Sequence, residues 1–281
     1  MKKFIIGTFL LGLVSCSNGK KAEPKLEDEV IAECKSGEVV NATPTGDFST
    51  LIWSDEFEID GRPCTQNWYH ETIPPNNGSW WNNEFQYYTD RIENSVVENG
   101  VLKIIARREN YEGKEFTSAR MITKNLFDFK YGKVEVRAKL PSGQGTWPAI
   151  WMLGANFDQV NWPACGEVDI MEHGNKEPGV VSSAVHLPNS EGQHYYMTNA
   201  LTIQNESTEF HRYAVEWTPE KLDFFVDNQK YHTFQIKDGM PFDKPFFLLL
   251  NVAMGGNFTN NQVDPNFVSS AMEIDYVRVY Q

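Results

Sequence analysis

Cysteine is scarce in this 281-residue chain, which has only four, and their spacing lacks the close pairs that a zinc site needs. Basic residues are outnumbered as well, since 25 lysines and arginines stand against 38 aspartates and glutamates and leave a formal net charge of -13. A nucleic-acid partner would require a basic face, so the charge argues against that class and favours a neutral substrate over a polyanion. We also find no internal repeat and no long amphipathic helix.

The apolar run near the amino terminus is too short to span a bilayer. It extends from Phe4 to Val14 behind two lysines, which is typical of an export signal. The Leu-Val-Ser-Cys sequence that follows resembles the bacterial lipobox, and this resemblance implies cleavage before Cys16 and a lipid anchor on that cysteine. A plain secretory signal is the alternative. In either case we expect export, and the lipobox places the protein on a bacterial membrane, at its periplasmic or cell-surface face.

Composition divides the chain into three segments. Residues 1–15 are the predicted lipoprotein signal peptide, and the polar residues 16–47, which contain no aromatic side chain, are a predicted lipid-anchored flexible tether. The folded domain is expected to cover residues 48–281. If Cys16 carries lipid, the other three cysteines allow at most one disulfide, and a bridge between Cys34 and Cys64 stays open, because pairing depends on the separation in space.

Short apolar runs separated by Gly, Asn, Asp and Pro predict that this domain is all-β. Residues 134–140 alternate between apolar and charged side chains, as a strand with one wet face does. Residues 222–226 alternate likewise and lead through an Asp-Asn turn into a second run, which predicts a hairpin. Residues 246–252 are apolar except for Asn251 and predict a strand buried on both faces. A single sandwich of two antiparallel sheets accounts for these patterns.

An acidic motif, Glu-Val-Asp-Ile-Met-Glu, occupies residues 167–172. On a regular strand Glu167 and Asp169 share a face, whereas Glu172 points to the opposite one. A β-bulge at residues 170–171 would return Glu172 to that face, where the two glutamates could approach the ~5 to 5.5 Å carboxyl separation of a retaining glycosidase. The spacing alone also allows an acidic strand edge or a calcium site. Three neighbouring acids repel one another, which favours a functional role.

The stretch from about residue 50 to 281 resembles glycoside hydrolase family 16, and within it the laminarinase branch of endo-β-1,3-glucanases. Residues 167–172 match the family's bulged Glu-x-Asp-x-x-Glu motif. Four further blocks match in the same order, at residues 82–89, 117–120, 143–152 and 275–280. The resemblance implies an all-β jelly-roll sandwich of two antiparallel sheets with a concave substrate cleft, and makes residues 48–281 the glycoside hydrolase catalytic domain.

The resemblance also implies a role for each acid. Glu167 is the nucleophile, Glu172 the general acid/base, and Asp169 the residue that holds the nucleophile and helps set its protonation. Because Glu172 lies close to ionised Glu167, its pKa should be raised, so that it can protonate the leaving oxygen. Two successive displacements retain the anomeric configuration. We therefore expect an endo-acting, monomeric β-glucanase that hydrolyses β-1,3-glucan or mixed-linkage β-1,3/1,4-glucan without a catalytic cofactor.

A glycan cleft needs aromatic platforms flanked by hydrogen-bonding side chains. The resemblance implies six such substrate-binding residues, namely Asn83, Glu84, Arg120, Trp147, Trp151 and His186. By themselves the tryptophans could be core residues, the arginine a surface ion-pair partner and the histidine a structural residue. Phe258 stands where laminarinases often have a tryptophan. The resemblance further implies one structural calcium, with ligands from Glu56, the Gly100 carbonyl and Asp275.

Two competing functions remain open at this point. One is a surface glycan-binding lipoprotein without hydrolytic activity, which the acidic trio opposes, because a binder has no need of three mutually repelling acids. The other is a family 16 hydrolase that acts on a marine galactan. The laminarinase-like blocks at residues 82–84 and 145–148 and the acidic charge argue against that substrate.

Overall fold

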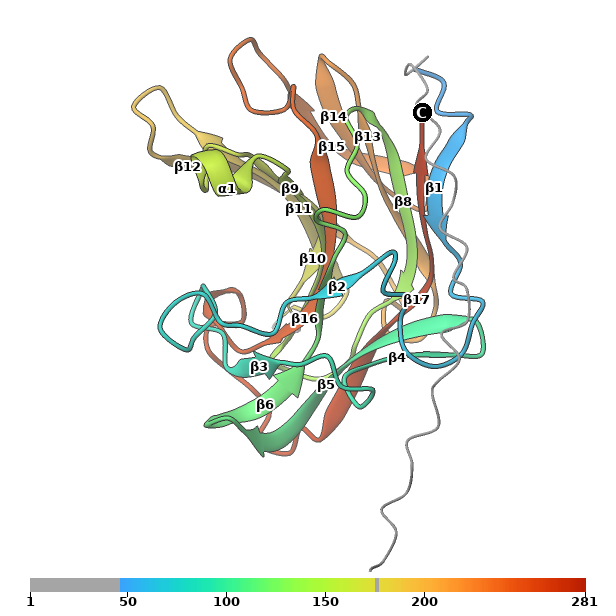
Figure 1. Cartoon of the computed structure of the whole chain (residues 1–281), viewed down its shortest axis with the longest axis vertical. Helices are drawn as coiled ribbons and strands as arrows, with labels where there is room; N and C mark the ends of the chain where they lie inside the picture. The colour runs from blue at the N-terminus through green and yellow to red at the C-terminus, as the bar shows by residue number, and fades with distance from the viewer. Residues whose placement is uncertain (1–45, 175–176) are drawn as a thin grey trace, which may run out of the picture. The chain divides into compact units, whose positions relative to one another are not determined.

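The computed structural model describes residues 46–174 and 177–281 (Figure 1). The predicted signal peptide, almost all of the predicted tether, and Cys16 lie outside the described residues. Within them the protein is built from strands, with one short α-helix, α1 (Phe157–Val160), and one 3-10 helix, η1 (Asn257–Thr259). Neither of these described helices has the length or apolar character needed to cross a membrane. The predicted all-β fold is confirmed.

The larger sheet has ten strands and forms one layer of the sandwich. Its path runs in the order β15 (Gln229–Gln235), β14 (Lys221–Val226), β13 (His211–Trp217), β8 (Gly132–Lys139), β17 (Ser269–Tyr280), β5 (Val101–Tyr111), β6 (Lys114–Ser118) and β3 (Gln86–Tyr88). Off this path, β1 (Leu51–Asp55) pairs with β17, and β4 (Ser95–Glu98) pairs with β5. The pairs are antiparallel, as predicted, except that β3 and β6 are parallel.

The smaller sheet has seven strands, all paired antiparallel. Their order is β12 (His194–Thr202), β11 (Val180–Pro188), β10 (Glu167–His173), β9 (Thr146–Gly154), β16 (Phe246–Met254), β7 (Arg120–Ile122) and β2 (Tyr69–His70). Figure 1 shows this sheet curving so that its hollow side faces away from the strands of the larger sheet. The strand that carries the acidic motif, β10, therefore lies near the middle of a concave sheet.

The core fills the space between the two sheets and follows the predicted alternation. Val134 and Val136 of β8 are fully buried in it, and burying one such side chain contributes roughly 1.5–3 kcal/mol. Strand β16 is buried along its whole length, as predicted. Leu250 faces the main core, whereas Leu249 belongs to a second cluster on the other face, where Trp151 packs against it.

The predicted hairpin at residues 222–234 is confirmed as β14 and β15. Both turn residues adopt a left-handed backbone, with φ of 49° at Asp227 and 69° at Asn228. Asp and Asn tolerate this conformation better than most residues, and it matches the twist of the two flanking strands.

The residues predicted to hold calcium have other partners in the structure. Glu56 accepts two hydrogen bonds from the guanidinium of Arg278, at 2.9 and 2.8 Å. Asp275 accepts one from Arg137 at 2.6 Å. Gly100 sits between β4 and β5 with φ of 75°. Since arginines already neutralise both carboxylates, the contacts give the calcium site no support, and it stays a prediction.

The cysteines within the described residues differ in state. Cys64 takes part in a disulfide, while Cys34, its candidate partner, lies outside the described residues. Cys165 is a buried free thiol whose pKa burial raises to about 11. It packs in the second hydrophobic cluster beside β16, which explains why it is buried without a bridge.

Candidate active site

The acidic motif forms β10, and the predicted bulge is present. Against β9, Asp169 pairs with Trp151 and Met171 pairs with the next residue, Ile150, so one residue of β10 is extra. The pairing with β11 shifts over the same stretch. Ile170 and Met171 both enter the core. This double step returns Glu172 to the face that carries Glu167 and Asp169.

The three carboxyl groups share an environment that disfavours negative charge. Burial is the largest cause that raises the pKa of Glu167, of Asp169 and of Glu172, each to about 8. The neighbouring charge of Asp169 raises the pKa of both glutamates further. Groups this close release their protons as a set. The charges of His186 and Arg120 favour the ionised form of Glu167 and so oppose part of the rise in its pKa.

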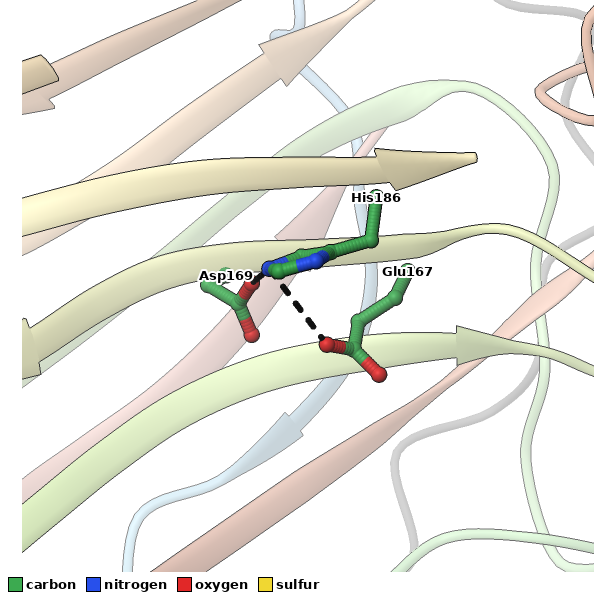
Figure 2. A group of neighbouring side chains, drawn as sticks. All are labelled: Glu167, Asp169 and His186. Atoms are coloured by element: carbon green, nitrogen blue, oxygen red, sulfur yellow. Dashed lines mark ion pairs between the residues drawn. The ribbon is translucent and has the colours of Figure 1, made fainter. Parts of the chain in front are cut away.

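His186 of β11 lies directly across from Glu167 in the strand pairing. Figure 2 shows its imidazole between two carboxylates, with Nε2 3.1 Å from Asp169 and 3.7 Å from Glu167. The approach to Asp169 is an ion pair without good hydrogen-bond alignment, since Oδ2 of Asp169 has no hydrogen-bond partner. One ligand atom from each of Glu167, Asp169 and His186 lies within 4.8 Å of the other two, close enough to bind a cation as well. A coordinated Glu167 could not act as a nucleophile, so a cation here would conflict with the role that the sequence predicts for Glu167.

Glu172 is held from the opposite side by a tryptophan. The indole Nε1 of Trp147, on β9, donates a hydrogen bond to Oε1 of Glu172 at 3.0 Å. This bond lowers the pKa of Glu172 and so opposes part of the effect of burial. The ring of Trp147 stacks on Phe258 with centroids 5.0 Å apart and planes 12° apart. Phe258 thus supports an aromatic platform beside Glu172.

Trp151, Arg120 and Glu84 belong to a second polar group on the same concave side. Trp151 donates from Nε1 to Asn251 at 2.8 Å. The guanidinium of Arg120 lies 4.7 Å from the Trp151 ring centre and donates to Glu71 at 2.6 Å. Burial raises the pKa of Glu84, while the charge of Arg120 opposes the shift. This packing fixes the ring of Trp151, which lies directly across from Asp169 in the pairing of β9 with β10.

A pocket of about 560 Å³ adjoins this group at the segment before β3. Its lining includes Asn83, which is exposed and donates to Asn257 at 2.7 Å. Trp80 is buried, whereas Trp81 is 53% exposed and lines the pocket. The backbone at Gly255 packs directly against the Phe85 ring. A Cβ added at this glycine would lie 2.4 Å from that ring, so only glycine fits.

The structure thus brings the predicted acids, both tryptophans, Glu84, Arg120 and His186 to one side of the seven-stranded sheet, with Asn83 at its margin. Three contributors escaped prediction: Asn251, Glu71 and His194. Asn251 had a signal, since it interrupts an otherwise apolar strand, and a polar residue there requires a partner. Glu71 and His194 had none, because β2 and β12 reach the site only through the sheet order.

Comparisons with known proteins agree with this geometry. Residues 80–278 match the family described as glycosyl hydrolases family 16. A beta-glucanase of Rhodothermus marinus is 43% identical, over 82% of this chain and 85% of its own. The crystal structure of LamA from Zobellia galactanivorans, in complex with laminaritriose and laminaritetraose, is 43% identical with a TM-score of 0.79, covering 83% of this chain and 100% of that chain.

A further solved structure broadens the range of linkages among these relatives. SCLam, a non-specific endo-beta-1,3(4)-glucanase, is 38% identical with a TM-score of 0.78, covering 88% of this chain and 98% of its own. The family match includes the acids of β10, the Trp147 platform and the carboxyl-terminal strand β17. With the bulged acidic strand in the concave sheet, these likenesses establish that the chain belongs to glycosyl hydrolases family 16.

Proposed function

We propose that the protein is an endo-acting β-1,3-glucanase that hydrolyses its substrate with retention of configuration. One observation carries the proposal: the bulge in β10 places Glu167 and Glu172 on the same concave face, each with its own partner. His186 lies beside Glu167, and Trp147 bonds to Glu172. The two glutamates therefore have different surroundings, as two different roles in one reaction require.

The reaction proceeds in two displacements. The carboxylate of Glu167 attacks the anomeric carbon, the glycosidic C–O bond breaks, and Glu172 gives its proton to the leaving oxygen. A glycosyl ester on Glu167 results. Glu172, now ionised, takes a proton from water, whose oxygen displaces Glu167 from the anomeric carbon. The Trp147 bond to Oε1 of Glu172 leaves Oε2 to hold the transferred proton.

Asp169 controls the proton on its neighbours. It is the most buried of the three carboxyl groups, with 5% of its surface exposed, and it lies between the two glutamates along the strand. While Asp169 keeps a proton, the site carries one less negative charge, and Glu167 ionises more easily. The positive charge of His186 has the same effect on Glu167.

The substrate we propose is a laminarin-like β-1,3-glucan, with mixed-linkage β-1,3/1,4-glucan as a second substrate. Support comes from the aromatic surfaces of Trp147 and Trp81, which suit the apolar faces of glucose rings, and from the polar pocket beside them. The relative from Rhodothermus marinus and SCLam carry glucanase names, and LamA was crystallised with laminaritriose and laminaritetraose. The name of SCLam, an endo-beta-1,3(4)-glucanase, supports internal cleavage.

Release of reducing ends from laminarin, lichenan, curdlan, agarose and xyloglucan tests the substrate. We expect laminarin to be cut fastest, into short oligosaccharides from the earliest time points, with the β-anomer formed first in proton NMR spectra. Initial formation of the α-anomer would contradict retention. Binding of laminarin without release of products over days would favour the glycan-binding alternative, and a preference for agarose would favour the galactan alternative.

We also propose that the mature protein is exported and anchored to a bacterial membrane through a lipid on Cys16. The lipobox-like residues 13–16 and the polar stretch that follows support this proposal. Metabolic labelling with a radioactive fatty acid should tag the wild type and leave Cys16→Ala untagged. If the substituted protein stays as firmly in the membrane fraction as the wild type, the anchor does not depend on Cys16.

A further inference from the structure

His186 is contacted at both of its ring nitrogens. Nε2 faces Asp169 and Glu167, as described above, and Nδ1 lies 2.8 Å from Nε2 of His194 on the neighbouring strand β12. The two imidazole planes differ by 9° and their centroids are 5.1 Å apart. Nearly coplanar rings at this separation meet edge to edge, so that the N–H of one points at the lone pair of the other.

Other aromatic rings hold His194 in place. The Trp162 ring centroid lies 4.4 Å from that of His194. Tyr196, two residues along β12 and therefore on the same face, lies 5.6 Å from His194 and 5.5 Å from His186. His194 itself is exposed. A chain of contacts therefore leads from the buried carboxyl of Asp169 through two imidazoles to solvent.

The contact between the histidines affects whether His186 can carry a positive charge. An imidazole that carries protons on both nitrogens needs an acceptor for each. The acidic residues lie on the Nε2 side of His186, and His194 supplies the acceptor at Nδ1. Partial burial and, after it, the charge of His186 lower the pKa of His194, which keeps His194 neutral and able to accept.

The charged groups around His186 come from three strands. Glu167, Asp169 and Glu172 face it from β10, and His194 from β12, next to the uncharged ring of Tyr196. Arg120 of β7 acts on Glu167 from farther along the sheet. The charge of His186 lowers the pKa of both Glu167 and Glu172. A residue that stabilises this charge therefore acts on both reacting groups.

We propose that His194 is a positioning residue of the hydrolytic site, which holds His186 against Glu167 and Asp169 and stabilises its doubly protonated form. His194 contacts neither reacting carboxyl group and acts through His186 alone. The inference rests on the proposed hydrolase function and adds a residue from the edge strand of the sheet. Since β12 is the outermost strand, a single side chain there couples solvent to the catalytic acids.

Two substitutions separate the hydrogen bond from packing. His194→Phe keeps an aromatic ring beside Trp162 but has no acceptor, whereas the amide oxygen of His194→Gln can accept from Nδ1 of His186. Tyr195→Ala is the matched control, because this exposed neighbour points to the opposite face of β12. Equal melting temperatures would show that all variants fold alike.

Kinetics on laminarin give the first readout. In His194→Phe we expect both limbs of the pH profile of kcat/KM to move to higher pH, because losing a nearby positive charge raises the pKa of both glutamates. At the wild-type optimum kcat should fall about 10-fold, with KM little changed. His194→Gln should recover most of this loss, and Tyr195→Ala should match the wild type. An unchanged profile in His194→Phe, or equal losses in His194→Phe and His194→Gln, would overturn the proposal.

The second readout needs no substrate. In protein labelled with 15N-histidine, a shared proton produces a scalar coupling between Nδ1 of His186 and Nε2 of His194, and His194→Phe should abolish it. A folded protein that shows the coupling but leaves laminarin intact would refute the proposed function and keep the histidine pair. A protein that hydrolyses laminarin but lacks the coupling would refute the pair alone.

Discussion

Two side chains on opposite sides of the acidic trio give chemically similar carboxyl groups different surroundings. The pKa of each acid is raised to about 8, so burial by itself does not distinguish them. His186 lies 3.7 Å from Glu167, and the Trp147 N–H bonds to Glu172. A protonated His186 favours the ionised form of Glu167, whereas the neutral N–H of Trp147 leaves the other oxygen of Glu172 free to carry a proton, as the two proposed roles require.

Azide should identify these two roles through the products that it forms. Glu167→Ala and Glu172→Ala should each reduce hydrolysis of laminarin by at least ~10³-fold. With azide and an aryl β-laminaribioside, Glu172→Ala should yield the β-glycosyl azide, since Glu167 still forms the ester and azide then displaces it. Glu167→Ala should instead yield the α-glycosyl azide in one displacement. The opposite pairing of variant and anomer would exchange the two roles.

Substituting the tryptophan should reveal its hydrogen bond to the acid/base. Trp147→Phe keeps a ring for stacking on Phe258 but removes the N–H that lowers the pKa of Glu172. The pKa of Glu172 should rise, so the basic limb of the kcat/KM profile should move to higher pH. Trp81→Phe, far from the acids in sequence and without a described bond to them, is the control. A shift of the basic limb to lower pH would contradict this account.

At the scale of the strand, the buried acids of β10 lower the stability of the fold when they are ionised. Its inner side chains, among them Ile170 and Met171, are fully buried, but its outer face gathers three acids. The unfolded chain releases a glutamic proton near pH 4.5, whereas folded Glu167 keeps it to about pH 8. Its contribution to stability is therefore complete below about pH 4.5 and is lost as the pH rises toward 8.

Glu167→Gln should consequently stabilise the protein in alkali. The amide does not titrate, so the variant should melt at a higher temperature than the wild type at pH 8, with a much smaller difference at pH 4.5. Each kcal/mol gained corresponds to roughly 2–4 °C for a domain of this size. Thermal unfolding followed by circular dichroism measures the effect. Glu220→Gln, an exposed position, should show no such dependence, and an equal gain at both pH values would exclude a titration effect.

Sequence patterns predicted a strand correctly wherever its burial shows in its own pattern of apolar and polar residues. Alternation was sufficient for β8, and an unbroken apolar run was sufficient for β16, because side-chain period and burial are local properties. The parallel pairing of β3 with β6 had no such signal. It joins two short segments that are far apart in the sequence, and β6 pairs with β5 along its other edge.

At the scale of the whole molecule, the acidic motif lies on one sheet of the sandwich, and the acids predicted to bind calcium lie on or beside the other. The seven-stranded sheet carries the acids, and the ten-stranded sheet carries the pairs Glu56–Arg278 and Asp275–Arg137. A calcium ion bound as the sequence predicts would have to displace both arginines. Exposed ion pairs contribute little each, so this displacement would cost little, and removal of calcium is the experiment that decides.

Chelation tests the calcium prediction directly. Because both carboxylates are already paired, we expect EDTA followed by dialysis to leave the melting temperature unchanged, and added Ca²⁺ to have no effect. Differential scanning calorimetry with and without Ca²⁺ makes the measurement, with Mg²⁺ as the control cation. A lower melting temperature in EDTA that Ca²⁺ alone restores, and that Asp275→Asn abolishes, would establish the calcium site.

The sequence by itself determined the fold class, the family and the three acids, including the bulge, since a five-residue spacing between Glu167 and Glu172 can meet on one face only through an extra residue. Only the tertiary structure decided which partners these acids have. Trp147 comes from β9, His186 from β11 and His194 from β12, and their distances depend on strand order and register. A local pattern shows which face a side chain takes, whereas the pKa of a buried acid depends on neighbours that only the folded sheet supplies.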